Sequence, residues 1–594
     1  MRRVRSTYRE RFPRPDSYRG RSSAGERSVD GRRLRIMLGI SWFLGVAIIL
    51  RLLVLQIFNY DYYAALAAGT HSIYRDLFPE RGSIMVRDRL GRETPVAANR
   101  ELFLVYADPR KVTNPNGAAA HLARVLGVDE MALLARLDRP DDPYEPLAHG
   151  VSKETLAEIK KLSLAGIDAA PEQLRTYPEK DFGGHVLGFV GSDAEGRKGG
   201  RYGLEGFWQK ELAGEAGSLR SERDAHGRLI SVGTVEIATA KDGADLLLTV
   251  DRTVQFVACA KLRAAVARHG ADGGTVVIAE PATGAIIAIC SAPDYDPNSY
   301  AEVDDLQVYN NPAISYQYEP GSIFKSITMS IALEEGKVKP ETTYTDTGEV
   351  RIPPDTIRNS DGKAYGVQTM TQVLDQSLNT GAVYAMRTVG ARTFRKYVES
   401  FGFGEATGVE LGNEVRGDTA ALRKSGEIYA VTASFGQGIA VTPLQLVAAY
   451  GALANGGKLM KPYIVAEVRR SDGTKEVTSP RVLREVISPR TSKFIAGMLT
   501  SVVERGHGKR AGVPGYYVAG KTGTAQVPKP GGGYDPDVTI GSFAGFAPAD
   551  DPKFVMLVKI DRPRDVIWAE STAAPLFGEL AAFLLQYYEV PPER

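Results

Sequence analysis

The chain is poor in the residues that build stapled or metal-dependent folds. Its 594 residues include only 2 cysteines, 7 histidines and 3 tryptophans. Two cysteines, Cys259 and Cys290, are too few for a disulfide framework, although one bridge between them is possible. No cluster of Cys, His and Asp has the spacing of metal ligands. We therefore predict neither a metal site nor a cofactor.

Net charge of one sign is also nearly absent, because the formal net charge is +2. The charge is uneven, however. Residues 1–35 hold twelve arginines and four acids (+8), and the remainder holds 61 basic and 67 acidic residues (−6). A polar tail without periodicity is more simply disordered and lipid-facing than nucleic-acid binding. Hydrophobic content of 43% and charged content of 24% are ordinary for globular protein, and the length suits two or three domains.

One long hydrophobic run is present, over residues 36–58. It is long enough to cross about 30 Å of hydrocarbon. Its single charge, Arg51, lies toward one end, where a long side chain can reach the interface. The preceding arginines predict a cytoplasmic N-terminus and an extracytoplasmic remainder. Two alternatives are a signal peptide cleaved near Ala65-Leu-Ala67 and a twin-arginine signal at Arg32-Arg33, but the apolar core is longer than a usual signal core.

Three short strings carry chemistry: Ser322-Ile-Phe-Lys325, Ser377-Leu-Asn379 and Lys521-Thr-Gly523, in that order. Each alone is weak evidence. A helix cap, a turn residue and a surface charge would explain Ser322, Asn379 and Lys521 one at a time. The chain also has a stray Ser-x-x-Lys string, Ser360-Asp-Gly-Lys363, in a polar stretch typical of a turn. Together the three strings predict acyl transfer through a serine.

The first string places a base beside a nucleophile. A serine hydroxyl is a poor nucleophile until a neighbour takes its proton. Residues three apart on a helix share a face, so Lys325 can reach Ser322 if the serine opens a helix after Pro320 and Gly321. A lysine pKa near ~10.4 is too high for a base at neutral pH. Burial and a nearby positive charge lower it, so we predict Lys325 as the base and Lys521 as the second cation and substrate clamp.

Histidine offers a weaker alternative. From Gly243 onward the only histidines are His269 and His507, and His507 belongs to a glycine-rich turn. A Ser-His-Asp triad therefore stays open as a less favoured interpretation.

The pattern of apolar segments predicts an α/β catalytic domain over residues 244–594. Hairpins are expected at 274–289 and 542–559, a terminal helix at 573–588, and a mainly helical lobe between 326 and 459. Residues 528–536 read as a flexible loop after the third string. These elements predict a sheet sandwiched by helices, with an additional helical lobe.

Residues 59–243 carry no catalytic set and are expected to form a mixed α/β module that spaces the catalytic domain from the membrane. Helical periodicity covers 118–126 and 154–162. His185 is predicted to pack or cap rather than catalyse. The remaining boundaries are a basic tail at 1–35 and the hydrophobic span at 36–58.

From residue 36 onward the chain resembles the class B penicillin-binding proteins, which are monofunctional peptidoglycan D,D-transpeptidases. The three strings match that family's motifs, which serine β-lactamases share. The flanks agree: these are Tyr318-Glu-Pro-Gly-Ser-Ile-Phe-Lys325, Val518-Ala-Gly-Lys-Thr-Gly-Thr-Ala525, Ile289–Asn298, Ser434–Gln445, Arg81-Gly82 and Gly203-Leu-Glu205. One departure is that three residues lie between Ile84 and Asp88, where the family usually has one.

The resemblance implies a penicillin-binding/serine β-lactamase-like fold, an N-terminal pedestal domain and one transmembrane helix. Ser322 would attack the penultimate D-Ala carbonyl of a stem peptide. Backbone N–H groups of Ser322 and Thr524 would form the oxyanion hole.

The same resemblance implies roles for the other two strings. Ser377 would relay the proton to the leaving amine, and Asn379 would hold the substrate amide. Thr522 and Thr524, with Gly523 between them, would bind the terminal carboxylate beside Lys521. An acceptor amine would then take the acyl group, and β-lactams would mimic the first step.

Several rivals share part of this pattern. A β-lactamase needs no pedestal or anchor, a sensor needs a cytoplasmic output domain, and a bifunctional synthase needs a glycosyltransferase domain. A non-enzymatic scaffold would be expected to lose catalytic residues. Within the family, Ser434-Phe-Gly-Gln-Gly-Ile-Ala-Val-Thr-Pro443 looks more like the division type than the elongation type. A membrane glycosyltransferase and divisome proteins are the expected partners at the cell membrane.

Overall fold

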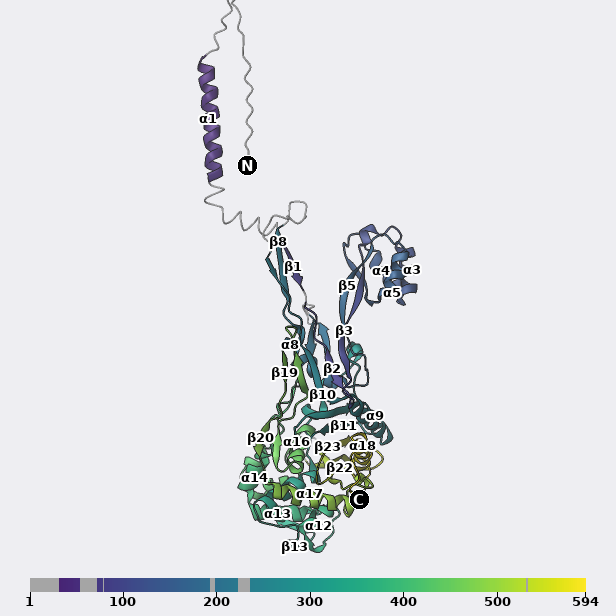
Figure 1. The fold of residues 1–594 in the computed structure, drawn as a ribbon, viewed down its shortest axis with the longest axis vertical. Helices are drawn as coiled ribbons and strands as arrows, with labels where there is room; N and C mark the ends of the chain where they lie inside the picture. Colours follow the sequence, from purple (N-terminus) through teal and green to yellow (C-terminus); the bar gives the residue numbers. More distant parts are fainter. Residues whose placement is uncertain (1–30, 54–71, 78, 193–197, 223–235, 530–532) are drawn as a thin grey trace, which may run out of the picture. The chain divides into compact units, whose positions relative to one another are not determined.

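The structure is a computed structural model, and Figure 1 draws it as a ribbon. It describes residues 31–53, 72–77, 79–192, 198–222, 236–529 and 533–594. The chain divides into two units, one formed by residues 1–76 with 218–238 and the other by residues 77–217 with 239–594.

The first unit contains a helix and a small sheet. Helix α1 (Gly31–Leu53) covers most of the expected helix over 36–58, whose residues 54–58 lie outside the described residues, as does the tail 1–30. Strands β1 (Ser72–Leu77), β8 (Gly217–Glu222) and β9 (Glu236–Ala238) form a sheet in the order β1-β8-β9. Among the described helices, none meets the length and hydropathy required of a membrane span.

The second unit is built around a five-stranded antiparallel sheet in the order β12-β11-β23-β22-β21. Its strands are β11 (Gly273–Ala279), β12 (Ile286–Ala292), β21 (Ala519–Pro528), β22 (Tyr534–Ala547) and β23 (Phe554–Asp561). Both predicted hairpins are confirmed. The loop expected over 528–536 is wrong at both ends, because Pro528 ends β21 and β22 already begins at Tyr534; its residues 530–532 lie outside the described residues.

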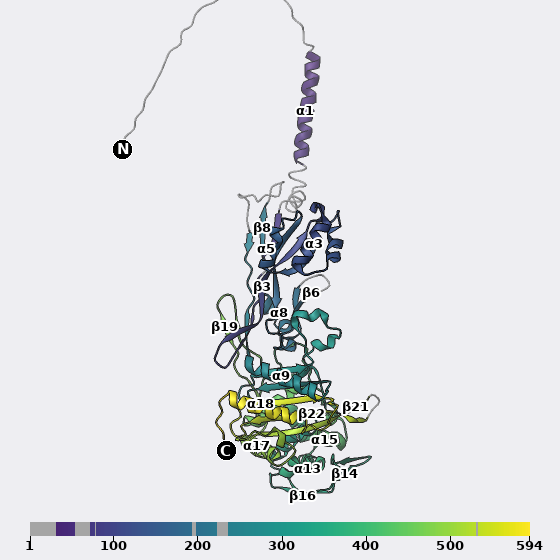
Figure 2. The same ribbon diagram turned by 90° about the vertical axis from the view of Figure 1, so that its right-hand side faces the viewer.

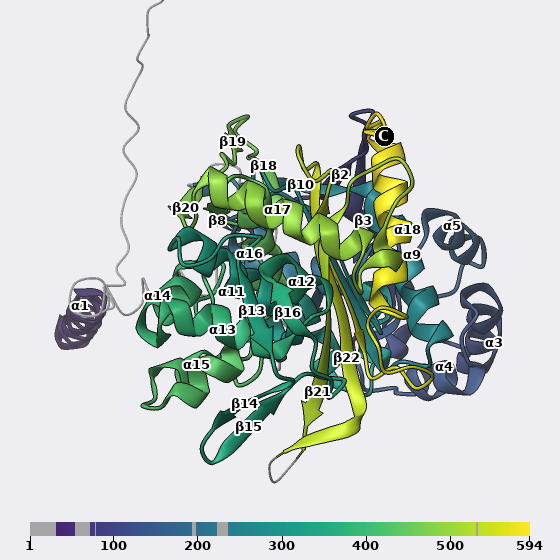
Figure 3. The same cartoon turned by 90° about the horizontal axis from the view of Figure 1, so that it is seen from below.

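Helices cover both faces of this sheet (Figure 3). Alternate residues of β23 enter different cores: Met556 packs with helices α9 (Arg252–Arg268) and α18 (Ala573–Tyr587), and Leu557 packs with α16 (Pro443–Ala454). This period of two is the geometry of a strand. Burial of both faces explains why β11 and β23 read as nearly continuous apolar runs. The predicted terminal helix is α18.

One disulfide ties α9 to β12. Cys259 and Cys290 are bonded, with their Cα atoms 5.4 Å apart. The bridge that the sequence left open is therefore present.

The helical lobe follows the Ser322–Lys325 string. Its helices are α11 (Lys325–Glu334), α12 (Met370–Asp375), α13 (Asn379–Val389), α14 (Ala391–Ser400) and α15 (Glu427–Ser434), with α16 and α17 (Pro489–Glu504) behind them. Two hairpins interrupt it: β13 (Thr343–Asp346) pairs with β16 (Gly366–Thr369), and β14 (Glu349–Ile352) pairs with β15 (Asp355–Arg358). These four strands were not predicted, because each has four residues and only Asp346 and Ile352 among them are buried.

A second sheet joins distant parts of the sequence in the order β19-β18-β10-β2-β3-β4, with β5 paired to β3. Its strands are β2 (Ile84–Arg87), β3 (Glu93–Ala107), β4 (Glu145–Val151), β5 (Ile167–Thr176), β10 (Asp245–Asp251), β18 (Val465–Arg469) and β19 (Lys475–Val477). Strand β10 runs parallel to β2 and antiparallel to β18. The sheet therefore contains strands from both the predicted pedestal and the predicted catalytic domain.

Three helices pack at one end of β3 and β5, as Figures 1 and 2 show. They are α3 (Pro115–Leu126), α4 (Glu130–Leu137) and α5 (Lys153–Lys161). The helices predicted over 118–126 and 154–162 are confirmed as α3 and α5. Shorter elements complete the unit: α6 (Gly184–Leu187), β6 (Phe189–Ser192), β7 (Lys198–Arg201), α7 (Gly203–Phe207), α8 (Gln209–Ala213), α10 (Pro312–Ser315), β17 (Lys458–Met460) and β20 (Val482–Glu485).

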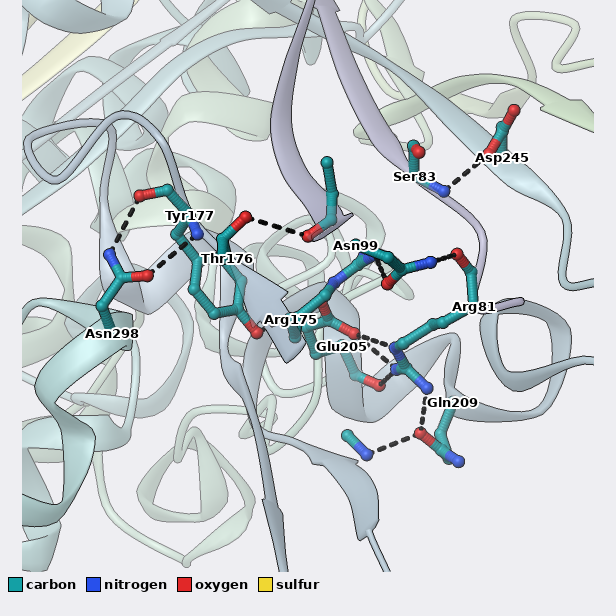
Figure 4. A network of polar contacts seen from close by, with 12 residues as sticks. Arg81, Ser83, Asn99, Arg175, Thr176, Tyr177, Glu205, Gln209, Asp245 and Asn298 are labelled. Atoms are coloured by element: carbon teal, nitrogen blue, oxygen red, sulfur yellow. Dashed lines mark hydrogen bonds and ion pairs between the residues drawn. The ribbon is translucent and has the colours of Figure 1, made fainter. Parts of the chain in front are cut away.

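A buried carboxylate organises the junction, the place where β5, α7 and the segment just before β2 meet (Figure 4). Glu205 is fully buried and accepts hydrogen bonds from Arg81 Nε at 2.7 Å, Arg175 Nε at 2.6 Å and the Tyr177 hydroxyl at 3.2 Å. The main chain of Tyr177 also exchanges two hydrogen bonds with the Asn298 side chain, at 2.9 and 3.0 Å. One carboxylate thus joins segments that are far apart in the sequence.

His185 packs as predicted. Its side chain is almost fully buried, its Nε2 lies 2.7 Å from the Val308 carbonyl oxygen, and its ring meets Tyr295 edge to face.

Candidate active site

The nucleophile candidate lies in a tight turn that enters a helix. Residues Gly321–Phe324 form a 3-10 turn, η5, and α11 begins at Lys325. Gly321 has a φ of 59° and donates its N–H to the Gly436 carbonyl at 3.1 Å. A Cβ at Gly436 would lie 2.2 Å from the Gly321 oxygen, so glycine is required there. Ser322 therefore opens a helix, as the sequence predicted.

Lys325 is one turn further along and is 1% exposed. Its Nζ donates to the Ser377 carbonyl at 2.6 Å and to the Ser377 hydroxyl at 3.3 Å. Burial, followed by the nearby charge of Lys521, holds the pKa of Lys325 well below its usual value. The amine can thus be neutral at a pH where a surface lysine is charged.

Lys521 approaches the same serine from strand β21. Its Nζ is fully buried and donates to the Ser377 hydroxyl at 3.0 Å and to the Thr522 carbonyl at 3.2 Å. Burial lowers the pKa of Lys521 to about 7, against the opposing influence of the Asp375 and Glu570 carboxylates. The second motif serine therefore lies between two lysines.

Ser377 owes this position to the turn between α12 and α13. Its φ is 55°, in the left-handed region that non-glycine residues seldom occupy. Such strain is tolerated where surrounding structure fixes it, and it clusters at functional sites. The next residue, Leu378, is 1% exposed and anchors the turn. Asn379 begins α13, and its Nδ2 donates to the Arg358 carbonyl at 2.8 Å.

The third motif packs directly against the nucleophile turn. A Cβ at Gly523 would lie 2.9 Å from both the Pro320 oxygen and the Ile323 Cγ2, so only glycine allows this approach. A Cβ at Gly321 would lie 3.1 Å from the Thr524 oxygen. The Thr524 hydroxyl accepts the Ala569 N–H at 3.2 Å. Strand β21 is also the edge of its sheet, which leaves one side of the strand without a strand partner in that sheet.

The structure thus brings the three strings together: Lys325 and Lys521 meet at Ser377, and Gly523 and Thr524 contact the turn that holds Ser322. The alternative residues make no recorded hydrogen bond to Ser322 or Ser377 within the described part of the chain. The His269 ring lies 2.9 Å from Asp565. His507 is nearer to the site, because its N–H donates to the Asp375 carbonyl at 3.2 Å, but its ring lies 3.0 Å from Glu570. Ser360 lies in an exposed turn.

Sequence reasoning missed one charged residue of this site, Asp375. Its side chain is buried at the end of α12, and its Oδ2 accepts the Ser501 hydroxyl at 2.8 Å. Burial raises the pKa of Asp375, and its negative charge in turn favours the protonated form of Lys521. The only signal was an acid that ends the apolar pair Val373-Leu374, two residues before Ser377.

The arrangement suits proton transfer at a hydroxyl. A neutral lysine amine can accept the proton of a serine, and a second ammonium can hold an anionic substrate group. Within the described residues, no group of three or more His, Cys, Asp or Glu side chains is arranged to hold a metal ion.

Comparison with known families matches both halves of the chain. Residues 274–582 match the penicillin binding protein transpeptidase domain, and residues 76–248 match the penicillin-binding protein dimerisation domain.

Individual relatives agree with these matches. Stage V sporulation protein D of Bacillus subtilis is 38% identical over 524 residues, covering 87% of this chain and 79% of that protein. The peptidoglycan D,D-transpeptidase FtsI of Escherichia coli K12 is 29% identical over 516 residues, covering 86% and 84%. The crystal structure of penicillin binding protein 3 from Mycobacterium tuberculosis, complexed with aztreonam, aligns with a TM-score of 0.67 at 27% identity, covering 88% and 98%.

Proposed function

The chain belongs to the class B penicillin-binding proteins and is a serine-type peptidoglycan D,D-transpeptidase, and we propose that Ser322 is its nucleophile. The observation that carries this assignment is the convergence of three motifs: the Ser322 turn packs on Gly523, and Lys325 and Lys521 both bind Ser377. A turn of this kind is not found at the stray Ser360, which lies in a solvent-exposed stretch.

Acylation begins with loss of the Ser322 hydroxyl proton to Lys325 Nζ. The oxygen attacks the penultimate D-Ala carbonyl of a stem peptide and forms a tetrahedral oxyanion. Backbone N–H groups of Ser322 and Thr524 stabilise that charge, an effect of about 3–4 kcal/mol per donor in a comparable hydrolase. Because burial and the nearby charge of Lys521 hold the pKa of Lys325 well below its usual value, its amine can take this proton without a histidine.

The leaving group departs with the proton. Ser377, which contacts both lysines, relays the proton to the amine of the terminal D-Ala. Asn379 holds the substrate amide, while Thr522 and Thr524 bind the terminal carboxylate beside Lys521. The acyl-enzyme is then attacked by an amine of a neighbouring stem peptide, which restores the Ser322 hydroxyl. A β-lactam undergoes the first step and stays bound.

Covalent labelling tests the nucleophile. Purified protein is treated with a fluorescent penicillin, digested, and the adduct is located by mass spectrometry. We expect the label on Ser322 and none on the Ser322→Ala variant. Ser360→Ala is the matched control, since it alters the stray Ser-x-x-Lys string and should label normally. An adduct elsewhere, or equal labelling of Ser322→Ala, would overturn the assignment.

The domain plan follows the sequence boundaries: a basic tail at 1–35, a single membrane span at 36–58, a pedestal at 59–243 and the transpeptidase domain at 244–594. The span is supported by the exposed apolar side chains of α1, among them Ile36, Phe43 and Ile49. The Cys259–Cys290 disulfide supports a catalytic domain outside the cytoplasm, because such bonds persist in oxidising compartments.

Reporter fusions test this topology. A reporter fused after Arg594 that works only outside the cytoplasm should be active, and a cytoplasmic reporter at the same position should be silent. Activity of the cytoplasmic reporter would reverse the orientation.

The cellular role is the septal cross-linking of stem peptides during division, with a membrane glycosyltransferase and divisome proteins as partners. The Ser434–Pro443 stretch, which resembles the division type, supports this role. A functional fluorescent fusion should concentrate at midcell in dividing cells. Uniform sidewall localisation would favour the elongation role instead.

A further inference from the structure

The carboxylate of Glu319 lies three residues before the nucleophile and has contacts that the transpeptidase mechanism does not use. Its Oε1 accepts the Gly438 N–H at 2.9 Å. The hydroxyl of Tyr534, at the start of β22, lies 3.0 and 3.2 Å from its two oxygens. One side chain therefore contacts both the Gly436–Gly438 segment and the far end of the β21–β22 hairpin.

The Gly436–Gly438 segment and the β21–β22 hairpin both contact the turn that contains Ser322. Gly436 accepts the Gly321 N–H, and Tyr318 and Val441 pair as an isolated antiparallel bridge on the same side. Glu319 thus adds a contact to the Gly436–Val441 segment, which binds the turn that contains Ser322. The β21–β22 hairpin carries Thr522 and Thr524, and Figure 3 shows the two strands running together beyond the sheet.

The hairpin end is supported by Val527, which packs against the main apolar core, and by the contact between Tyr534 and Glu319. Strand β21 is an edge strand, and Tyr534 pairs with Pro528 four residues past Thr524. In the described part of this hairpin end, Lys529 and Asp535 pair with each other, whereas the Tyr534 hydroxyl reaches outward to Glu319. Two contacts therefore hold the hairpin next to the turn that contains Ser322. Gly523 packs against Pro320 within the sheet, and Tyr534 binds Glu319 near the tip of the hairpin.

We propose that Glu319 and Tyr534 are positioning residues for acylation: their hydrogen bond keeps strand β21 against the nucleophile turn, so that the N–H groups of Ser322 and Thr524 face one oxyanion. This inference rests on the proposed roles of Ser322 and Thr524. A displacement of the hairpin end moves Thr524 relative to Ser322, and such misplacement lowers the rate of the chemical step. Burial raises the pKa of Glu319, and its two hydrogen-bond donors favour the charged form against that effect.

The test compares acylation rate constants at saturating fluorescent penicillin for wild type, Tyr534→Phe, Glu319→Gln and Glu319→Ala. Tyr534→Phe removes one hydroxyl and should slow acylation about threefold to tenfold, the range that a lost hydrogen bond of this kind gives. Glu319→Ala should be slower still, and Glu319→Gln should recover part of the rate because its amide oxygen can still accept. Melting temperatures should stay near that of wild type.

A double-mutant cycle separates positioning from general damage. Tyr534→Phe should have no further effect in the Glu319→Ala background, because the contact is already lost. Tyr397→Phe is the matched control: its hydroxyl also binds a glutamate, Glu335, at 2.7 Å, but on the surface of the helical lobe, and it should acylate like wild type.

The outcomes are distinguishable. Failure of wild type to label Ser322 would overturn the proposed function itself. Normal labelling of Ser322 with Tyr534→Phe equal to wild type, or additive effects in the double variant, would overturn the positioning role alone.

Discussion

Two clusters of buried charge in this protein contrast in how their charge is compensated. At the junction, the Glu205 carboxylate lies between the guanidinium groups of Arg81 and Arg175. At the proposed active site, Lys325 and Lys521 are also buried, but their recorded contacts within the described residues are with hydroxyl and carbonyl oxygens. Buried charge that is paired organises the fold, whereas buried charge that is unpaired shifts its pKa and becomes reactive.

The lowered pKa values of the two lysines also affect stability. Both active-site lysines have lowered pKa values, so the unfolded chain binds more protons than the folded one between those values and 10.5. The free energy of unfolding therefore rises with pH across that interval through these two groups. At neutral pH the two buried lysines therefore lower the free energy of unfolding, and interactions elsewhere in the fold must offset this loss.

The largest expected effect comes from replacing the buried ammonium group of Lys325 with a guanidinium group. Lys325→Arg keeps a positive charge, but a guanidinium stays ionised and cannot accept the serine proton. We expect acylation by fluorescent penicillin to slow by about 10²–10⁴-fold, the contribution of a general base. The control is Lys337→Arg, an exposed lysine just after α11, which should react normally. Near-normal acylation by Lys325→Arg would show that another group activates Ser322.

The next effect belongs to the paired cluster and should appear in stability. Glu205→Gln leaves two buried guanidinium groups without their carboxylate, which should lower the free energy of unfolding by about 3–5 kcal/mol. Denaturant titration measures this change. Glu215→Gln removes an exposed partner of Lys241 and should leave the unfolding midpoint unchanged. If Glu205→Gln unfolded like wild type, the junction would not depend on this carboxylate.

A smaller loss is expected from the reciprocal exchange, Arg175→Lys. An ammonium cannot reproduce the fork that reaches Glu205 and Asn99 together, so one hydrogen bond to a charged group is lost. We expect unfolding to be easier by about 1.5–3 kcal/mol, with the acylation rate of the folded protein unchanged. A slowed acylation step at unchanged stability would mean that the two clusters are coupled.

The smallest expected effect is a shift in the pH dependence of acylation. Protonated Lys325 cannot act as a base, so acylation should slow as the pH falls through its pKa. The charge of Lys521 lowers that pKa, so Lys521→Met should move the acid limb to higher pH, apart from any loss of absolute rate. Rates normalised to each variant's maximum measure the shift. If the acid limb of the pH–rate profile did not move, the charge of Lys521 would not be lowering the pKa of Lys325.

The sequence anticipated the parts of the site that have a local signature. Ser322 and Lys325 follow a helix-entry pair, and the hairpins around residues 281–284 and 550–552 have turn residues between apolar runs. These features depend on neighbours within a few residues. The prediction of a helix at 573–588 succeeded for the same reason.

The missed parts depend on distant neighbours or conflict with local rules. Asp375 gains its importance from Ser501 and Lys521, which only the fold brings near it. The start of β22, Tyr534-Asp-Pro-Asp537, contains residues that are unfavourable in strands; Tyr534 pairs with Pro528, and the register then shifts before pairing resumes at Thr539. Glu205 has the sequence context of a short helix, and nothing local announces its two arginine partners.

The second sheet also has a consequence for how the protein is made. Strands β2 and β3 appear early in synthesis, but β10 can pair with β2 only after residue 251 has been made. Strands β18 and β19, which extend the sheet from β10, are complete only after residue 477. Contacts with such sequence separation form slowly, and unpaired strand edges attract other chains in the meantime. We therefore expect a fragment ending at residue 243 to aggregate unless the missing edge is supplied in trans. The nascent N-terminal half would then need protection until the last strand of its sheet has emerged.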